Sequence, residues 1–297
     1  MLSKFLDPKN DVAFKKIFGT EKNQDILIHF LNDMLVFKAG KPITQVTFLK
    51  TVQDPEIAAK KTSIVDIMCA DDFGNQYIVE MQVAEGDTFI KRAQYYAAKA
   101  YSSQLKVADK YNTLKEIIFL AITNFIMFPK KKEFKSDHVI LDKVTNDHDL
   151  KDFSFTFLEL AKFKKSKEEL SGIIDRWSYF FKHADETSEK DLQQIIGKDP
   201  IIQRAYEELN KFSWSEEELR SYDAVIKREM DNQAILDKRY NDGKAVGIAE
   251  GEARGEARGE AKNAKDIAKK MLNEGMDINL IAKFTSLSIE EIKKLFI

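Results

Sequence analysis

The sequence predicts an α/β protein whose mixed sheet core has the element order α-β-β-β-α-β, flanked by helices and followed by a helical C-terminal extension. Three patterns carry this prediction. Apolar residues recur at helical spacing before residue 36, β-branched residues alternate with others over 43–82, and a continuous apolar run fills 117–122. Helical spacing indicates an amphipathic helix, alternation indicates a half-buried strand, and an uninterrupted run is typical of a strand buried on both faces.

Two helices are expected at the start of the chain. Asp7-Pro8 is a start signal, Gly19 is a stop signal, and Asn23 is a candidate cap for the second helix. The second helix is amphipathic, and its apolar stripe consists of Ile26, Leu27, Phe30, Leu31, Met34 and Leu35. His29 lies off that stripe, so we assign it a structural role.

The remaining elements follow from the same patterns. Three strands are expected over 43–82 and a helix over 87–107. The run 117–122 supplies the next strand, and shorter strands at 139–141 and 153–160 extend the sheet. After 167 the pattern is charge-rich and helical, and its aromatic residues are interpreted as packing residues: Trp177, Tyr179, Phe180, Phe181, Phe212 and Trp214.

A tight hairpin is expected between the second and third strands. Residues 72–74, Asp-Phe-Gly, suit a three-residue loop in which the glycine takes the left-handed conformation. Pairing outward from this loop places Asp66 opposite Glu80 and Ile64 opposite Gln82. Two carboxylates are therefore predicted to face each other across the hairpin.

Asp66 and Glu80 share their face with mostly apolar neighbours, because residues two apart in a strand point the same way. Carboxylates opposed on a face suited to burial repel each other unless a proton or a cation lies between them. A divalent cation resolves the repulsion, and Mg²⁺ commonly takes one or two carboxylates together with water and substrate phosphate. In the alternative reading the hairpin is a surface ribbon with hydrated acids, although its apolar pattern fits a solvated face poorly.

Length and composition bound the class of protein. The 297 residues are 43% hydrophobic, and the single Cys69 excludes internal disulfides and zinc sites with two or more cysteine ligands. Because a lone cysteine suits a reducing compartment, a cytoplasmic location is expected. No apolar run approaches the ~20 residues needed to span a bilayer, so no membrane partner is expected. The net charge of −2 excludes a polycation that coats nucleic acid. Any DNA contact must be local, and two lysine clusters could supply it, although solvated loops are the favoured explanation. The clusters are Lys130, Lys131, Lys132 and Lys135, then Lys162, Lys164, Lys165 and Lys167.

Four segments are expected along the chain: a core at 1–165, a helical extension at 166–240, a glycine repeat at 241–262 and a small helical tail at 263–297. In the repeat, glycine recurs every four residues. A helical glycine costs about 1 kcal/mol against alanine, so the repeat is either a flexible linker or a helix held by a partner. The tail has the pattern of a helix-turn-helix and serves either DNA recognition or contact within a homo-oligomer or with another partner.

Several short motifs carry a likeness to a known family. They are Asp11-Val-Ala-Phe14-Lys15-Lys-Ile-Phe18-Gly19, Val65-Asp66, Glu80-Met81-Gln82, and Arg92 followed by Tyr95 and Tyr96. With the element order above, they resemble the PD-(D/E)XK nuclease fold and, more closely, the Rpn family of recombination-promoting nucleases and transposases. The likeness covers about the first 165 residues and extends loosely into the glycine repeat and the tail.

The resemblance implies hydrolysis of DNA phosphodiester bonds, with Asp66, Glu80 and Gln82 as catalytic residues. Asp66, Glu80 and the Met81 carbonyl would hold Mg²⁺ or Mn²⁺, which polarises the phosphate and activates water. Gln82 stands where the wider fold has Lys, and this substitution is also seen in the Rpn family. An uncharged amide can orient water or phosphate but cannot act as a base. Positive charge is expected from Lys61, Lys91 or Arg92. The helical face that carries Arg92, Tyr95, Tyr96 and Lys99 adds candidates for contact with phosphate or DNA.

Two functions from different classes are compatible with these residues. The favoured one is a metal-dependent DNA endonuclease with little sequence preference, acting in DNA recombination or mobile-element biology. The alternative is a catalytically inactive, nuclease-like scaffold that binds DNA or a partner protein, with a proton rather than a metal between the two acids.

Overall fold

The computed structural model describes residues 3–35, 42–53, 63–84, 86, 88–106 and 109–296. The chain divides into two compact units, Met1–Ile226 and Lys227–Ile297. The segment boundaries expected from the sequence, after residues 165, 240 and 262, stay a prediction.

The first unit opens with two helices, α1 (Asp11–Phe18) and α2 (Gln24–Met34). Helix α1 is capped by the side chain of Asn10, which accepts the Val12 N–H, rather than beginning at Asp7-Pro8. Gly19 ends this helix as expected. Asn23 precedes α2 but makes no cap hydrogen bond with its side chain, because its amide donates to the Lys16 carbonyl at 3.0 Å instead.

In the described part of the chain, six strands form one mixed sheet in the order β1-β4-β5-β6-β8-β7. Strands β5, β6 and β8 run parallel, while β1–β4, β4–β5 and β7–β8 pair antiparallel. The bounds are β1 (Val46–Phe48), β4 (Ile67–Asp71), β5 (Gln76–Gln82), β6 (Ile117–Thr123), β7 (Lys135–Val139) and β8 (Phe153–Glu159). Two short strands, β2 (Val52–Gln53) and β3 (Ser63–Ile64), form a separate pair.

The expected α/β fold with a mixed sheet and a helical C-terminal region is confirmed. The expectation of three strands over 43–82 is wrong, because β1 to β5 all fall there. Strand β6 is buried along its whole length, as its apolar run predicts. Strand β7 lies earlier than the expected 139–141, because it pairs with β8 through Lys135 to Val139.

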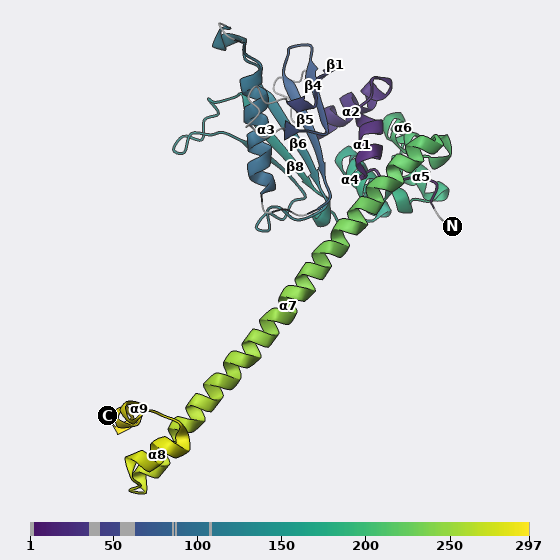
Figure 1. Cartoon of the computed structure of the whole chain (residues 1–297). Coiled ribbons are helices and arrows are strands. Elements are labelled where there is room, and N and C mark those ends of the chain that lie inside the picture. Colours follow the sequence, from purple (N-terminus) through teal and green to yellow (C-terminus); the bar gives the residue numbers. More distant parts are fainter. Residues whose placement is uncertain are drawn as a thin grey trace. The chain divides into compact units, whose positions relative to one another are not determined.

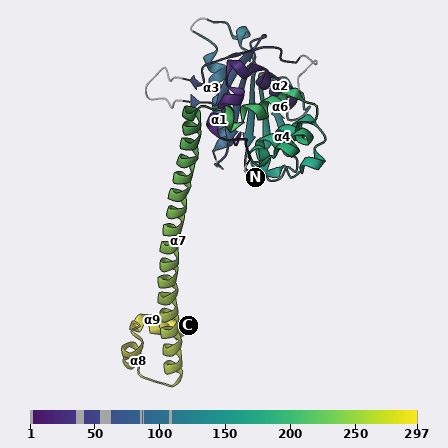
Figure 2. The ribbon, with the colours of Figure 1, turned by 90° about the vertical axis from the view of Figure 1, so that its right-hand side faces the viewer.

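Helices cover both faces of the sheet (Figure 1). On one face lies α3 (Phe89–Ser103), which buries Phe89, Ala93, Ala97 and Ala100. These side chains recur at helical spacing and are mostly small, so α3 packs closely on the sheet. The opposite face is covered by α1, α2 and the later helices (Figure 2), which share one hydrophobic cluster with it.

The later helices of the first unit are α4 (Ile173–His183), α5 (Glu189–Ile196) and α6 (Pro200–Glu208). Trp177 is fully buried and packs against Phe18 and Phe30, with ring centroids 5.9 and 5.1 Å apart. Phe180, Phe181 and Trp214 are buried as well, which agrees with the packing role expected for them. Phe212 is 79% exposed, so that expectation is wrong for this residue.

Short 3-10 helices connect several of these elements. They are η1 (Glu21–Asn23), η3 (Tyr111–Thr113), η4 (Leu160–Lys162), η5 (Lys167–Glu169), η6 (Ala184–Glu186), η7 (Lys211–Ser213) and, near the C-terminus, η8 (Lys294–Phe296).

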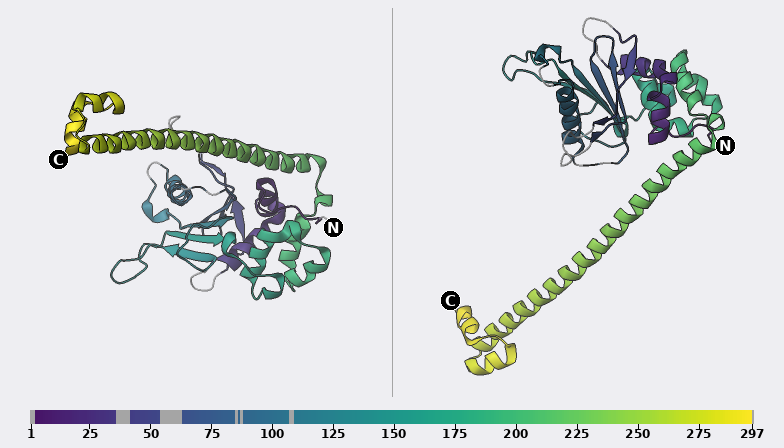
Figure 3. Two further views of the ribbon diagram at one scale, coloured as in Figure 1. Left: turned by 90° about the horizontal axis from the view of Figure 1, so that it is seen from below. Right: turned by 45° about the horizontal axis from the view of Figure 1, so that its top comes forward.

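Helix α7 (Glu216–Asn273) begins in the first unit and continues through the glycine repeat, so the repeat is helical. All side chains from 227 to 263 are exposed. In the second unit, α8 (Ile278–Thr285) and α9 (Ile289–Lys293) pack at the end of α7 around Ala268, Ile281 and Ile292 (Figure 3). Among the described residues, no helix is long and apolar enough to cross a membrane.

Candidate active site

The hairpin of β4 and β5 has the expected loop and register. Gly74 has a φ of 84°, the left-handed conformation that glycine adopts without a steric penalty. Ile67 pairs with Val79 and Ala70 with Gln76, as the sequence predicts. The register of the hairpin therefore brings Asp66, one residue before β4, to the level of Glu80.

The pairing expected beyond Asp66 is wrong. Strand β4 begins at Ile67, and Ile64 pairs with Val52 of β2 instead of lying opposite Gln82. The Asp66 carboxylate accepts the Met81 N–H at 2.9 Å, so a side chain takes a backbone donor directly before β4 begins. The chain can thus leave the sheet at Asp66 without leaving this donor unsatisfied.

The two predicted carboxylates lie close together, and each accepts a backbone N–H from the facing segment of the hairpin. Asp66 Oδ2 accepts the Met81 N–H, and Glu80 Oε1 accepts the Asp66 N–H at 3.3 Å. Glu80 is 3% exposed, whereas the Asp66 side chain is 19% exposed. The pair is therefore buried on the Glu80 side and open on the Asp66 side.

The protonation of this pair reflects its surroundings. Burial and the negative charge of Asp66 together raise the pKa of Glu80 to about 8, although the positive charge of Arg92 opposes the shift. Burial also raises the pKa of Asp66, while the Met81 N–H and the Lys15 ammonium oppose the shift. Burial thus disfavours the charged form of each acid, and a cation bound between them would favour it.

Gln82 is fixed in orientation by its neighbours. Its amide nitrogen donates to Glu80 Oε2 at 3.3 Å and to the Met81 carbonyl at 3.2 Å. Its amide oxygen accepts a hydrogen bond from the Arg92 guanidinium, which comes from α3 and lies 4.9 Å from the Phe89 ring centroid. The C-terminal end of β5 and helix α3 therefore meet at Gln82.

The other residues expected at the site divide into three groups. Lys61 lies outside the described residues. Burial raises the pKa of Tyr96, and the charges of Arg92, Glu80 and Asp66 also act on it, so Tyr96 lies near the acid pair. Lys91 is exposed on α3, and Lys99 is half-buried two turns beyond Arg92.

The sequence reasoning missed Lys15 as a residue of the site. Its ammonium lies 3.9 Å from Asp66 Oδ1 and 2.7 Å from Asp11 Oδ1. Helix α1 buries Ala13, Phe14, Ile17 and Phe18, which leaves Lys15 on the other side. The helical spacing of those apolar residues indicates that Lys15 is off the core, but only the packing of α1 beside β4 reveals its neighbour.

The donor atoms present fit a small divalent cation. Among the described residues no group of three or more His, Cys, Asp or Glu side chains gathers to hold a metal. A magnesium site does not require such a group, since one or two carboxylates with water and phosphate suffice. Asp66, Glu80 and the adjacent Met81 carbonyl offer hard oxygen atoms, and burial, which raises the pKa of both acids, favours a bound cation over two unpaired charges.

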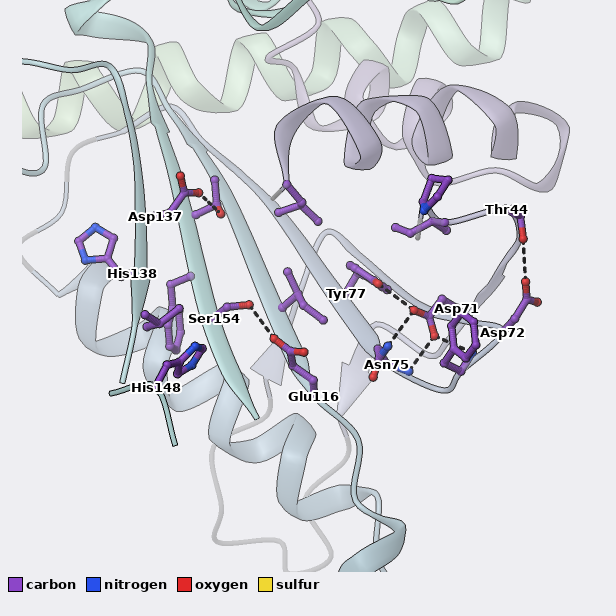
Figure 4. Close-up of a pocket in the computed structure, with 18 residues that line it drawn as sticks. Thr44, Asp71, Asp72, Asn75, Tyr77, Glu116, Asp137, His138, His148 and Ser154 are labelled. Carbon is purple, nitrogen blue, oxygen red and sulfur yellow. Dashed lines mark hydrogen bonds between the residues drawn. The ribbon is translucent and has the colours of Figure 1, made fainter. Parts of the chain in front are cut away.

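A cavity of about 520 Å³ lies at the opposite end of the hairpin and does not include the pair. Its acids are already hydrogen-bonded (Figure 4): Asp71 accepts the Tyr77 hydroxyl at 2.8 Å, and Asp137 accepts the Thr156 hydroxyl at 2.7 Å. Glu116 accepts the Ser154 hydroxyl at 3.3 Å. These three acids each accept a side-chain hydroxyl, whereas Asp66 and Glu80 accept backbone and amide N–H groups and lie next to each other.

A mixed sheet with two acids at a strand end and helices on both faces is the architecture of a PD-(D/E)XK nuclease. Residues 8–239 match the family described as PD-(D/E)XK nuclease family transposase. Residues 261–296 match the C-terminal HTH domain of the Rpn/YhgA-like nuclease family. The chain therefore belongs to the PD-(D/E)XK nuclease family transposases, and the predicted likeness to Rpn nucleases is confirmed. Comparison with curated proteins finds no match, and comparison with solved structures finds none.

Proposed function

We propose that this protein is a metal-dependent DNA endonuclease that uses Mg²⁺ or Mn²⁺ and cleaves with little sequence preference. Family membership gives the class, a nuclease, and the helix-turn-helix match favours DNA as its partner. The observation that carries the finer proposal is the adjacent pair of Asp66 and Glu80: Glu80 accepts the Asp66 N–H, and Asp66 accepts the Met81 N–H. We further propose a role in DNA recombination or mobile-element biology, in the cytoplasm.

Asp66, Glu80 and the Met81 carbonyl hold the metal in this proposal. A bound divalent cation would neutralise the two acids, polarise the phosphate and lower the pKa of a water molecule. In the hydrolysis, the water oxygen forms a bond to phosphorus and loses its proton to solvent. The P–O ester bond breaks with its electron pair on the leaving oxygen, which takes a proton from solvent.

Gln82 acts as a positioning residue in this proposal. It cannot accept a proton as a base at neutral pH, and its amide nitrogen already contacts Glu80 Oε2. Arg92 holds the amide oxygen, so the amide group cannot flip without losing a charge-assisted hydrogen bond. Gln82 therefore orients Glu80 and presents a neutral, directional group toward the attacking water or the phosphate.

A second candidate is the inactive scaffold that binds DNA or a partner protein. The pKa of about 8 for Glu80 favours it, because without metal a proton sits on Glu80 at neutral pH and relieves the repulsion. The two candidates differ in what removal of the acids does to catalysis.

The test is cleavage of supercoiled plasmid by the purified full chain with Mg²⁺, with Mn²⁺ and with a chelator. Asp66→Ala is compared with Asp72→Asn, an exposed aspartate in the loop of the same hairpin. We expect metal-dependent nicking by the wild type and the Asp72 variant and none by Asp66→Ala. Equal nicking by Asp66→Ala and wild type would remove the endonuclease proposal.

A further inference from the structure

The Gln82 position lacks the ammonium group that the PD-(D/E)XK pattern places two residues after the acidic residue. A transition state for phosphodiester cleavage accumulates negative charge on the phosphoryl oxygens, and a preorganised cation lowers its free energy. Arg92 donates to the Gln82 amide oxygen, and its charge also acts on Glu80 and Asp66 from the α3 side. An ammonium group that could contact the phosphate from the open side of the pair must come from another element.

Helix α1 brings such a charge to the open side of the pair. Lys15 Nζ lies 3.9 Å from Asp66 Oδ1, the carboxylate oxygen that is not bonded to the Met81 N–H. The Lys15 side chain is 41% exposed, so a bound polynucleotide can reach it. Glu80 lies on the buried side of the same pair, away from solvent.

The position of Lys15 is fixed by the packing of α1. Four side chains of α1 are fully buried, and a Cβ at Gly19 would lie 3.5 Å from the Ile67 side chain, at the first residue of β4. Helix α1 therefore contacts the strand that begins directly after Asp66. Asp11, one turn earlier on the same helix, holds the Lys15 ammonium at 2.7 Å and limits its rotamers.

We propose that the Lys15 ammonium, supplied by α1, contacts the scissile phosphate and replaces the lysine that is absent at position 82. This inference rests on the proposed nuclease function and names a residue for it. Lys15 stabilises the negative charge on a phosphoryl oxygen while Asp66 and Glu80 hold the metal. No proton transfer is assigned to it, so its role depends on charge and position alone.

An ammonium that works in this way has a signature that a structural lysine lacks. Before DNA binds, its positive charge repels a divalent cation at Asp66, so its removal strengthens metal binding. During cleavage the same charge stabilises the transition state, so its removal slows the reaction. A lysine that only supported the fold would instead weaken metal binding and cleavage together, with a loss of thermal stability.

The experiment compares Lys15→Gln, Lys15→Arg and Lys16→Gln in the full chain. Lys16 is the matched control, because it lies on the same helix but pairs with Glu218 and stacks 4.5 Å from the Trp214 ring centroid. Binding of Mn²⁺ alone is measured by calorimetry, melting is followed by fluorescence, and single-turnover nicking of supercoiled plasmid is measured at saturating Mn²⁺.

We expect Lys15→Gln to slow nicking by about 10²-fold while it tightens Mn²⁺ binding by a few-fold. Lys15→Arg should recover most of the rate because it keeps the charge, and Lys16→Gln should nick like the wild type. Nicking by Lys15→Gln within threefold of an active wild type would overturn this inference and leave the endonuclease proposal intact. Weaker Mn²⁺ binding together with a lower melting temperature would also overturn it. A wild-type chain that does not nick would overturn both proposals.

Discussion

The two ends of the β4–β5 hairpin differ in the hydrogen-bond partners and neighbours of their carboxylates. At the loop end, Asp71 accepts hydrogen bonds from the Phe73 and Asn75 N–H groups, the Asn75 amide and the Tyr77 hydroxyl at 2.8 to 3.0 Å. At the open end, Asp66 accepts the Met81 N–H and lies beside a second acid, Glu80. A carboxylate that accepts four hydrogen bonds stabilises the turn. Two adjacent buried carboxylates are instead suited to binding a cation, which neutralises their charge.

The largest effect is expected from Glu80→Gln. This change keeps the shape of the side chain but removes a negative oxygen ligand, so nicking should fall by about 10³-fold. Single-turnover nicking at saturating Mn²⁺ measures the loss. Asp71→Asn, at the other end of the hairpin, is the control and should nick at the wild-type rate. An equal loss of nicking in both variants would contradict a catalytic role that is confined to the open end.

The next effect is a pH dependence of stability that comes from Glu80 at the open end. Folding raises the pKa of Glu80 from 4.5 to about 8, so between these values the native state binds more protons than the unfolded state. The free energy of unfolding of the metal-free chain should therefore fall as pH rises from about 4.5 to about 8, by a few kcal/mol in order of magnitude.

Denaturant unfolding at pH 5 and pH 8, in the presence of a chelator, checks this pH dependence. Glu80→Gln should flatten the profile and stabilise the metal-free chain at pH 8, because the neutral amide mimics the protonated acid. Saturating Mn²⁺ should restore the stability of the wild type at pH 8 but not that of the variant. A profile that is as steep in Glu80→Gln as in the wild type would contradict this assignment.

A smaller effect is expected from Arg92→Met, which removes the donor that holds Gln82. The amide then loses its fixed orientation, and nicking should fall by about 10- to 100-fold, the range typical of groups that orient metal ligands. Gln94→Ala, an exposed change on the same helix, is the control. Wild-type nicking by Arg92→Met would show that Gln82 needs no support.

The smallest of these effects concerns the loop end. Asp71→Asn replaces a charged acceptor with a neutral group that accepts fewer hydrogen bonds, so the free energy of unfolding should fall by about 1–2 kcal/mol. Urea unfolding at pH 7 measures the change. A variant as stable as the wild type would show that the four donors around Asp71 find other partners.

The sequence predicts the hairpin well because its determinants are local. Gly74 requires the left-handed turn, the turn sets the register, and the register brings Asp66 to Glu80. Strand β6 is equally readable, because only a strand covered on both faces tolerates seven consecutive buried residues.

The parts that escaped prediction depend on contacts between distant segments. The chain leaves the sheet at Asp66 because its side chain bonds to the Met81 N–H, which alternation of apolar residues cannot reveal. Lys15 reaches Asp66 from 51 positions earlier in the chain only because α1 packs beside β4. Helix α1 is capped by Asn10 and not by Asp7-Pro8. Both are residue types that can begin a helix, so the local sequence does not choose between them.

The glycines of α7 also have a consequence for exchange of backbone amide protons with solvent. Gly243, Gly247, Gly251, Gly255 and Gly259 lie in a fully exposed helical stretch, and each weakens it by about 1 kcal/mol relative to alanine. In the described chain, the hydrophobic clusters draw no residue from 227–262, so a local opening there disrupts none of them. The backbone amides of 243–259 should therefore exchange with deuterium long before those of α3. A partner bound to this stretch would slow its deuterium uptake.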